Sequence, residues 1–307
     1  MTPSTSPTPL TSLGISRTHY AELNAPDPAA AAAFAVDHLG LELVHVDDSG
    51  RHYLAGHGLD RYSLVYGPGD GEIDHISYLL RSPSDLARAE RALADAGLPH
   101  RPVAPSALWR HEPALRFTHQ TGVELELTTG VNVPTTMHWA VATPSATPAP
   151  ITCDHAILRA SDVSAANTFN SSVMGLRESS RIVAPDGIPV LTFFRAHTLY
   201  HCFGTARSDR NGLHHVAFTL KNDLALFAAH ESIRDAGDVE IVWGPVRHGA
   251  GGNIAFYFRD QVGHLIEFSA EEEVILNEDT YAPDVWPTSL DRASDEWGSH
   301  PPDAIKG

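Results

Sequence analysis

The sequence contains a fourfold internal repeat, and this repeat constrains the fold more than any other feature. Four segments begin with a short apolar stretch that carries a histidine, at His19, His75, His155 and His215. The second and fourth segments both reach an Asp-Ala-Gly tripeptide whose glycine lies 22 positions after the histidine. A period of about 60 residues that recurs four times predicts four copies of one small unit.

Each copy predicts a strand, an amphipathic helix and then two or three further strands, which is a βαβββ module. We expect helices over 27–38 and 162–174 in the first and third copies, with Asp27 and Asp162 as N-caps. Gly97 and Gly237 are suited to left-handed C-caps in the second and fourth. The predicted fold class is therefore α+β, with four βαβββ modules arranged as two pairs.

The modules predict two domains with irregular segments around them. The expected boundaries are 1–13 for a leader, 14–132 for an N-terminal domain, 133–150 for a linker, 151–270 for a C-terminal domain and 271–307 for a tail. The tail holds ten acidic and two basic residues. It is either a solvated terminus or a lid, because Tyr281, Trp286 and Trp297 are unusual in a disordered segment.

Charge and composition exclude several classes of partner. The net charge is −17, from 38 acidic and 21 basic residues, which argues against nucleic acid and anionic membranes. No run approaches the ~20 apolar residues of a transmembrane helix, and the start has no apolar signal region. Cys153 and Cys202 are too few for a disulfide framework. These features favour a cytoplasmic protein.

Histidine is abundant, with 19 in 307 residues, and its spacing predicts a metal site. His155, His215 and Glu267 fall on three strands, 60 and 52 positions apart. Two imidazoles and one carboxylate form the facial set that holds a divalent metal and leaves positions open, typical of non-haem Fe(II). His214 competes with His215, but His215 aligns with His75 and His155. We therefore expect His214 to point to the opposite face of the strand.

The chain resembles the type I extradiol catechol dioxygenases of the vicinal oxygen chelate superfamily over nearly its whole length. The stretches that carry the resemblance are Leu-His-His-Val-Ala-Phe at 213–218, Gly-Pro-Val-Arg-His-Gly at 244–249 and the segment 257–267, which ends in Glu267. The resemblance implies two vicinal-oxygen-chelate domains with mixed, strongly curved sheets. In this family the first domain usually has no working site, so the C-terminal domain is expected to be catalytic.

The resemblance also implies roles for three further residues. His201, 14 positions before His215, corresponds to the acid–base histidine, with His197 as the substitute if that assignment is wrong. His248 and Tyr257 lie 19 and 10 positions before Glu267 and correspond to groups that line the substrate site.

The sequence departs from the family pattern at two positions. Three further residues are placed near the site without an assigned role. Cys202 and Gln261 replace an aspartate and a proline that are usual in the family. By analogy alone, Trp243, Thr192 and Arg292 lie near the pocket.

The function implied is an Fe(II)-dependent extradiol dioxygenase of aromatic hydrocarbon catabolism. It would insert both atoms of O2 into a catechol and give a muconic-semialdehyde-type product. Mn(II) satisfies the same ligands, so the choice of iron comes from the family. The resemblance further implies a homotetramer or another homo-oligomer. The alternatives are a glyoxalase-type metal-dependent lyase or isomerase and a non-catalytic small-molecule-binding protein of the same fold.

The N-terminal half keeps His19, His75 and Glu126 at the ligand positions, with spacings of 56 and 51. Its counterparts of the other site residues are Arg61, Ala107 and Arg116, none of which matches the family. We therefore expect a relic pocket without turnover. Whether it binds a second metal is left open.

Overall fold

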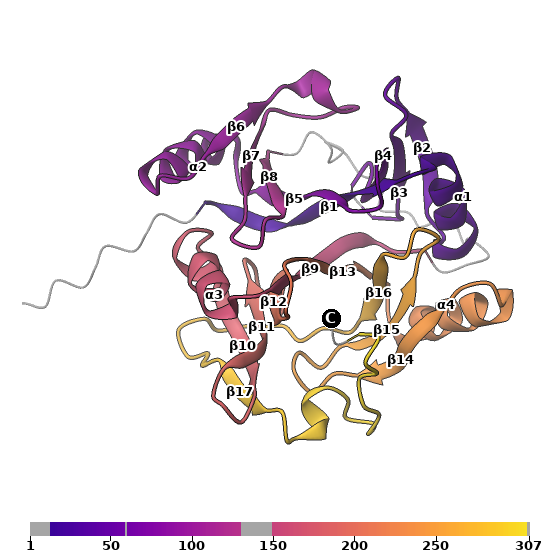
Figure 1. Cartoon of the computed structure of the whole chain (residues 1–307), viewed down its shortest axis with the longest axis vertical. Coiled ribbons are helices and arrows are strands. Elements are labelled where there is room, and N and C mark those ends of the chain that lie inside the picture. The colour runs from indigo at the N-terminus through magenta and orange to yellow at the C-terminus, as the bar shows by residue number, and fades with distance from the viewer. Residues whose placement is uncertain (1–12, 59, 130–148, 306–307) are drawn as a thin grey trace, which may run out of the picture.

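The structure is a computed structural model that describes residues 13–58, 60–129 and 149–305. Most of the predicted leader and linker lie outside the described residues. The described chain forms two mixed sheets, one in each half, which lie against one another (Figure 1).

Each half contains two βαβββ modules. The first module is β1 (Ile15–Ala25), α1 (Pro28–Leu39), β2 (Glu42–Val46), β3 (His52–Ala55) and β4 (Leu64–Pro68). The second is β5 (Ile73–Leu80), α2 (Pro83–Asp95), β6 (His100–Val103), η1 (Pro105–Ala107), β7 (Ala114–Thr118) and β8 (Glu124–Thr128). The third is β9 (Thr152–Ala160), α3 (Val163–Ser172), β10 (Arg177–Val183), β11 (Pro189–Arg195) and β12 (Phe203–Arg207). The fourth is β13 (Gly212–Thr219), α4 (Asp223–Ala236), β14 (Ile241–Arg247), β15 (Ile254–Arg259) and β16 (Leu265–Ala270).

The strand orders of the two sheets repeat one another. The first sheet runs β2-β3-β4-β1-β5-β8-β7-β6, and the second runs β14-β15-β16-β13-β9-β12-β11-β10-β17. In each, the first strands of the two modules pair antiparallel at the centre, and each also pairs in parallel with the last strand of its own module. The predicted α+β class with four βαβββ modules is confirmed.

The helices begin and end where local chemistry predicts. The side chains of Asp27 and Asp162 accept hydrogen bonds from Ala30 N and Ala165 N, which satisfies backbone donors of the first turn. Gly237 caps α4 in the left-handed region, with φ of 75°. For α2 the C-cap is Ala96, and the left-handed Gly97 follows it.

The two halves share their hydrophobic cores. One core cluster combines residues of the first and fourth modules, for example Ala35 of α1 with Ala229 of α4, and these helices contact one another (Figure 1). A second cluster combines the second and third modules, for example Leu93 of α2 with Phe169 of α3. Because apolar area from both halves is removed from water together, the sheets are held in a fixed relation.

The described part of the tail packs on the second sheet. Its strand β17 (Asp284–Pro287) extends the sheet by pairing in parallel with β10, and the short helix η2 (Asp291–Ala293) follows. The side chains of Ile275, Ala293, Asp295 and Ile305 are buried. Among the described residues, no helix has the length and apolar character needed to cross a membrane.

Candidate active site

A cavity of about 600 Å³ lies within the second sheet, closed on one side by the tail. Apolar side chains form most of its wall, among them Ile157, Val190, Leu191, Phe193, Ala206 and Leu290. The tail contributes Thr288, Leu290, Ala293, Ser294, His300, Pro301 and Ile305. The predicted ligands and the three further site residues all line this same cavity.

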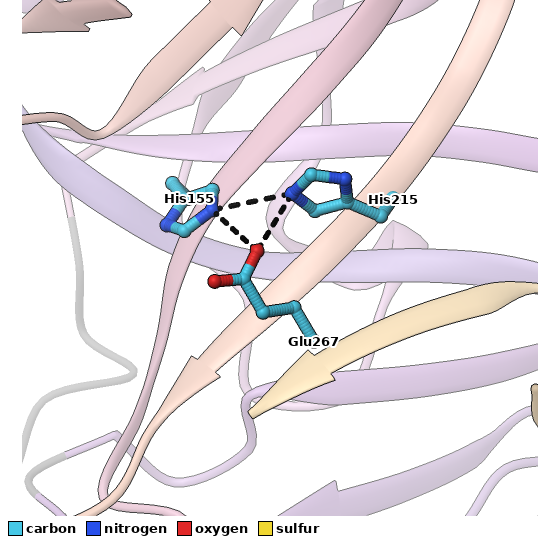
Figure 2. Close-up of side chains that lie close together, drawn as sticks. All are labelled: His155, His215 and Glu267. Atoms are coloured by element: carbon cyan, nitrogen blue, oxygen red, sulfur yellow. Dashed lines mark hydrogen bonds and ion pairs between the residues drawn. The ribbon is translucent and has the colours of Figure 1, made fainter. Parts of the chain in front are cut away.

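The structure brings His155, His215 and Glu267 together (Figure 2). They come from β9, β13 and β16, which are neighbours in the sheet. Nε2 of His155 lies 3.3 Å from Nε2 of His215. The Glu267 Oε2 atom lies 3.2 Å from the first nitrogen and 2.9 Å from the second. All three side chains are buried, and their ligand atoms converge on one point at the cavity wall.

These distances fit a divalent metal. Nitrogen and oxygen donors bind such ions at about 2.1 Å, so neighbouring ligands of an octahedral ion lie about 3 Å apart. The three separations of 2.9, 3.2 and 3.3 Å match one face of that octahedron. Two imidazoles and one carboxylate are also the donor set of the facial triad, which leaves the cavity side open to other ligands.

Charge interactions tie the three groups together. Burial lowers the pKa of His155, but the carboxylates of Glu267 and Asp154 outweigh burial and raise it to about 10. Burial raises the pKa of Glu267, yet the two histidines hold it well below its usual range. A proton on His155 therefore neutralises the carboxylate in the metal-free protein, and a metal ion would displace this proton.

Further residues orient the ligands. Nδ1 of His155 lies 2.9 Å from Oδ2 of Asp154, and Asn253 Nδ2 lies 3.4 Å from the second Glu267 oxygen. Such contacts fix the ring tautomer and the direction of a ligand. The sequence interpretation missed both residues. The repeat carried a signal for one of them, because Asp74 also precedes His75 and contacts its Nδ1 at 2.7 Å.

The prediction that His214 points away from the site is wrong. His214 lines the cavity, and its Nδ1 lies 2.7 Å from Nδ1 of His215. The register of β13 against β9 shifts between Leu213 and His215, so His214 is the extra residue of a β-bulge. A bulge interrupts strict alternation and lets adjacent residues serve the same side.

His201 lies beside the triad, and its substitute His197 does not. The rings of His201 and His155 have centroids 3.9 Å apart, and His201 lines the cavity. Glu272 of the tail accepts a hydrogen bond from His201 N at 2.7 Å and lies 2.5 Å from its Nδ1. Burial and the neighbouring His155 lower the pKa of His201 to about 3. His197 does not line the cavity, and its Nδ1 accepts a hydrogen bond from Leu199 N.

His248 and Tyr257 form a hydrogen-bonded pair beside the triad. Nδ1 of His248 donates to the Ser294 carbonyl at 2.7 Å, so its Nε2 accepts from the Tyr257 hydroxyl at 2.9 Å. The rings of Tyr257 and Trp243 stack with centroids 5.6 Å apart. Burial raises the pKa of Tyr257 well above its usual value, and so does the charge of Glu267, so the phenol keeps its proton.

Of the three residues placed near the pocket by analogy, one lines the cavity and two do not. Trp243 lines the cavity, whereas Thr192 faces the other side of β11 and accepts a hydrogen bond from Asn167. Arg292 pairs with Glu296 at the surface. Cys202 is buried in the shared core, and Gln261 is exposed, so neither lines the cavity.

In the N-terminal half, His19 does not take the position that His155 has in the triad. The pairing of Ala21 with Ile76 matches that of Ala156 with Val216, so Tyr20, not His19, corresponds to His155. The register shift between Thr18 and Tyr20 falls on His19, whose Nε2 lies 3.8 Å from Asp60. A shift of one residue changes the side chain that a strand presents, and this overturns the predicted alignment.

The positively charged side chain of Arg116 lies between His75 and Glu126. Arg116 donates through Nε to Glu126 Oε2 at 2.8 Å, and its Nη2 lies 3.0 Å from His75 Nε2. Tyr20 donates to Glu126 Oε1 at 2.7 Å. Burial raises the pKa of Glu126, but His75, His111 and Arg116 hold it well below its usual range. The guanidinium therefore compensates the carboxylate that corresponds to Glu267.

One other group of potential ligand atoms occurs among the described residues, formed by Glu22, Asp74 and His75. Arg51 Nε donates to Glu22 at 2.6 Å, and Arg116 donates to Asp74 at 3.2 Å. Because both carboxylates already have guanidinium partners, this group is a poor competitor for a cation.

Comparison with known proteins shows what this chain is similar to. Residues 152–268 match the Glyoxalase/Bleomycin resistance protein/Dioxygenase superfamily. A metapyrocatechase of Pseudomonas sp. (strain CF600) is 25% identical over 265 residues, covering 83% of this chain and 85% of the relative. A manganese-dependent 2,3-dihydroxybiphenyl 1,2-dioxygenase of Geobacillus genomosp. 3 is 23% identical over 284 residues, covering 89% and 90%.

Solved structures agree with this fold. Homoprotocatechuate 2,3-dioxygenase from Brevibacterium fuscum, in its complex with 3,4-dihydroxyphenylacetate, superposes with a TM-score of 0.87 at 22% identity, covering 98% of this chain and 94% of the other. The enzyme from Arthrobacter globiformis gives a TM-score of 0.85 at 21% identity, covering 98% and 93%. Residues 152–268 thus match the model of the Glyoxalase/Bleomycin resistance protein/Dioxygenase superfamily, and the described chain as a whole has the fold of the two homoprotocatechuate 2,3-dioxygenases.

Proposed function

We propose that this chain is an extradiol ring-cleavage dioxygenase, which inserts both atoms of O2 into a catechol and opens the ring beside its two hydroxyl groups. The observation that carries the proposal is the position of His201, His248 and Tyr257 around the open side of the His155–His215–Glu267 triad. A metal site with only a binding role has no need of three such proton-carrying groups.

The metal that we propose is Fe(II), held by His155, His215 and Glu267. When bound there, it would supply a common anchor for the two catechol oxygens and O2 and a route for electrons between them. Mn(II) prefers the same ligands, and one relative is named as manganese-dependent, so Mn(II) is the second candidate.

His201 is the proposed acid–base group. Burial and the neighbouring His155 lower its pKa to about 3 in the absence of metal, so its ring is neutral at pH 7 and has a lone pair to offer a catechol hydroxyl. A metal that displaces the proton of His155 would remove one cause of this lowering. The His201 ring can accept the hydroxyl proton and return it when the ring bond breaks. Glu272 lies against Nδ1 of this ring, so Nε2 is the nitrogen left for the substrate.

Tyr257 and His248 are the proposed positioning groups for the substrate oxygens. The hydrogen bond between Tyr257 and His248 keeps the phenolic proton at a defined place. The stacked Trp243 ring restricts rotation of the tyrosine. With its proton directed to His248, the phenolic oxygen keeps lone pairs that can accept a hydrogen bond from a substrate hydroxyl.

The proposed substrate is a catechol with an apolar substituent. A cavity of about 600 Å³ is of the size that holds drug-sized ligands, and it exceeds the needs of a single ring. Ile157, Leu191 and Phe193 offer apolar surface next to the triad. Cytoplasmic location and homo-oligomer formation stay predictions.

Oxygen consumption by metal-loaded protein tests this function. The chain is stripped with a chelator, reloaded without air with Fe(II) or Mn(II), and offered catechols with hydrogen, alkyl or phenyl substituents. We expect one O2 consumed per catechol and the appearance of a yellow product. Glu267→Gln should abolish uptake, and the matched control Glu240→Gln, at an exposed carboxylate, should not.

Two results would contradict the proposal. The first is the absence of oxygen uptake with every catechol by protein that holds its metal. The second is turnover of a hemithioacetal by the same protein, which would identify a glyoxalase-type isomerase. Binding of catechol without either reaction would indicate the non-catalytic alternative.

A further inference from the structure

His214 connects the metal ligand His215 to the C-terminal tail. Its Nδ1 lies 2.7 Å from Nδ1 of His215, and its Nε2 lies 2.7 Å from the carbonyl oxygen of Ile305. The chain positions of the two partners are 90 residues apart, so only the tertiary fold brings them to the same imidazole. Both contacts lie in the cavity wall, where His214 and Ile305 are lining residues.

With a metal ion in place of a proton on Nε2 of His215, the three groups have one consistent arrangement of protons. A carbonyl oxygen only accepts, so Nε2 of His214 donates to Ile305. A neutral imidazole carries one proton, so Nδ1 of His214 is then an acceptor, and Nδ1 of His215 must donate to it. This leaves the lone pair on Nε2 of His215. That nitrogen is the atom that faces Glu267 and His155.

We propose that His214 is a positioning residue of the metal centre, and that the Ile305 carbonyl anchors it, so that the end of the described tail helps to orient the ligand His215. The inference rests on the proposed function only in taking the triad as a metal site. A hydrogen bond to the second nitrogen of a ligand histidine fixes its tautomer and ring direction and raises its basicity. Here the acceptor is His214, whose own ring is held by its hydrogen bond to the Ile305 carbonyl.

The other site histidines show why the tail suits this role. His155 receives its corresponding contact from Asp154, on its own strand. His248 and His201, like His214, take theirs from the tail, through the Ser294 carbonyl and the Glu272 carboxylate. The tail therefore reaches three separate imidazoles around one cavity, and Ile305 is the last of these contacts along the chain.

Metal affinity of the whole protein tests the proposal. The constant is measured by competition with a chelator, using Mn(II), in the wild type, in His214→Leu and in His214→Asn. His214→Leu removes both contacts, and we expect affinity to fall about 10- to 100-fold. His214→Asn keeps an acceptor near the place of Nδ1, and we expect it to recover a large part of this loss. His230→Ala, on α4 against Phe256 and outside the cavity, is the matched control and should bind as the wild type does.

Shortening the chain tests the anchor. A chain that ends at Pro301 lacks the Ile305 carbonyl but keeps Glu272 and Ser294. It should bind Mn(II) more weakly in the wild-type background and no more weakly in the His214→Leu background, because the two changes act through one imidazole. The Co(II) absorption spectrum should shift in both single variants, and circular dichroism of the metal-free proteins checks that they fold.

The outcomes separate this inference from the proposed function. Wild-type affinity and an unchanged Co(II) spectrum in folded His214→Leu would overturn it, as would additive losses in the shortened double variant. Protein that binds metal with the expected His214 dependence but consumes no oxygen would overturn the proposed function alone. Full metal binding by His215→Ala would overturn both.

Discussion

The acid–base assignment depends on individual imidazoles whose chain positions are close and whose surroundings differ. His201 and His197 are four positions apart, yet only His201 lines the cavity. Burial lowers the pKa of both rings, so the charge state does not separate them. Distance to the triad does, because the ring centroid of His201 lies 3.9 Å from that of His155. The position of each ring relative to the triad, and not its pKa, therefore distinguishes His201 from His197.

His201→Gln provides the corresponding test. Glutamine keeps hydrogen-bonding capacity but cannot act as the acid–base group, so we expect kcat to fall about 10²- to 10⁴-fold. Metal content should stay as in the wild type, since His201 is not one of the triad residues. His197→Gln is the control and should retain the wild-type kcat. A normal rate in His201→Gln together with a loss in His197→Gln would reverse the assignment. Steady-state kinetics and metal analysis of the same samples give both readings.

At the scale of elements, the strands were predictable and their irregularities were not. The repeat predicted β9, β13 and β16 and the triad residue that each carries. It did not predict the extra residue at His214 or at His19, because a β-bulge changes backbone pairing without a distinct side-chain pattern. The adjacent Asp154 was also missed, although the repeated Asp-His pair was visible in the sequence.

One contact between the two halves should make the stability of the protein depend on pH. His119, in the turn between β7 and β8, donates through Nε2 to Oδ1 of Asn170 on α3 at 2.8 Å, and its Nδ1 lies 2.9 Å from Thr121 Oγ1. The ring is 2% exposed. Burial lowers its pKa to about 4 from an ordinary value of about 6.5, and the bond to Asn170 only partly opposes this. The folded protein therefore holds this imidazole neutral where the unfolded chain protonates it.

Acid should weaken this contact in a defined window. Between pH 6.5 and pH 4 the unfolded state binds more protons at His119, so the free energy of unfolding falls as the pH falls. From pH 7 to pH 5 we expect a loss of about 2 kcal/mol from this residue. His119→Gln keeps a donor for Asn170 and cannot titrate. Urea unfolding of the metal-free proteins should give a shallower pH dependence in the variant, and equal slopes would refute the assignment.

At the scale of the whole molecule, the two halves have one fold and different electrostatics. In the C-terminal half, the carboxylate of Glu267 faces two histidines and the cavity. In the N-terminal half, Arg116 compensates the corresponding Glu126, and Tyr20 takes the place of a ligand histidine. A guanidinium and a divalent cation cannot occupy the same place beside one carboxylate. This supports the proposal that, among the described residues, only the C-terminal triad binds a metal.

We therefore expect one metal ion per chain, and the same content in Glu126→Gln. That variant leaves Arg116 without its buried partner, so the free energy of unfolding should fall by about 3–5 kcal/mol. Glu240→Gln is the control, because Glu240 pairs at the surface with Arg259, and it should cost less than about 1 kcal/mol. Elemental analysis and urea unfolding measure the two effects. Two metal ions per chain, one of them lost in Glu126→Gln, would refute the prediction.

The sequence by itself determined the repeat, the βαβββ order and the three triad residues. Periodicity and spacing can be read from the order of the residues without knowledge of the fold. The core shared between the halves, the bulge at His214 and the reach of the tail to His201, His248 and His214 were decided by the tertiary structure. These features depend on contacts between residues far apart in the chain. Such contacts form only when burial of apolar surface brings the strands and the tail together.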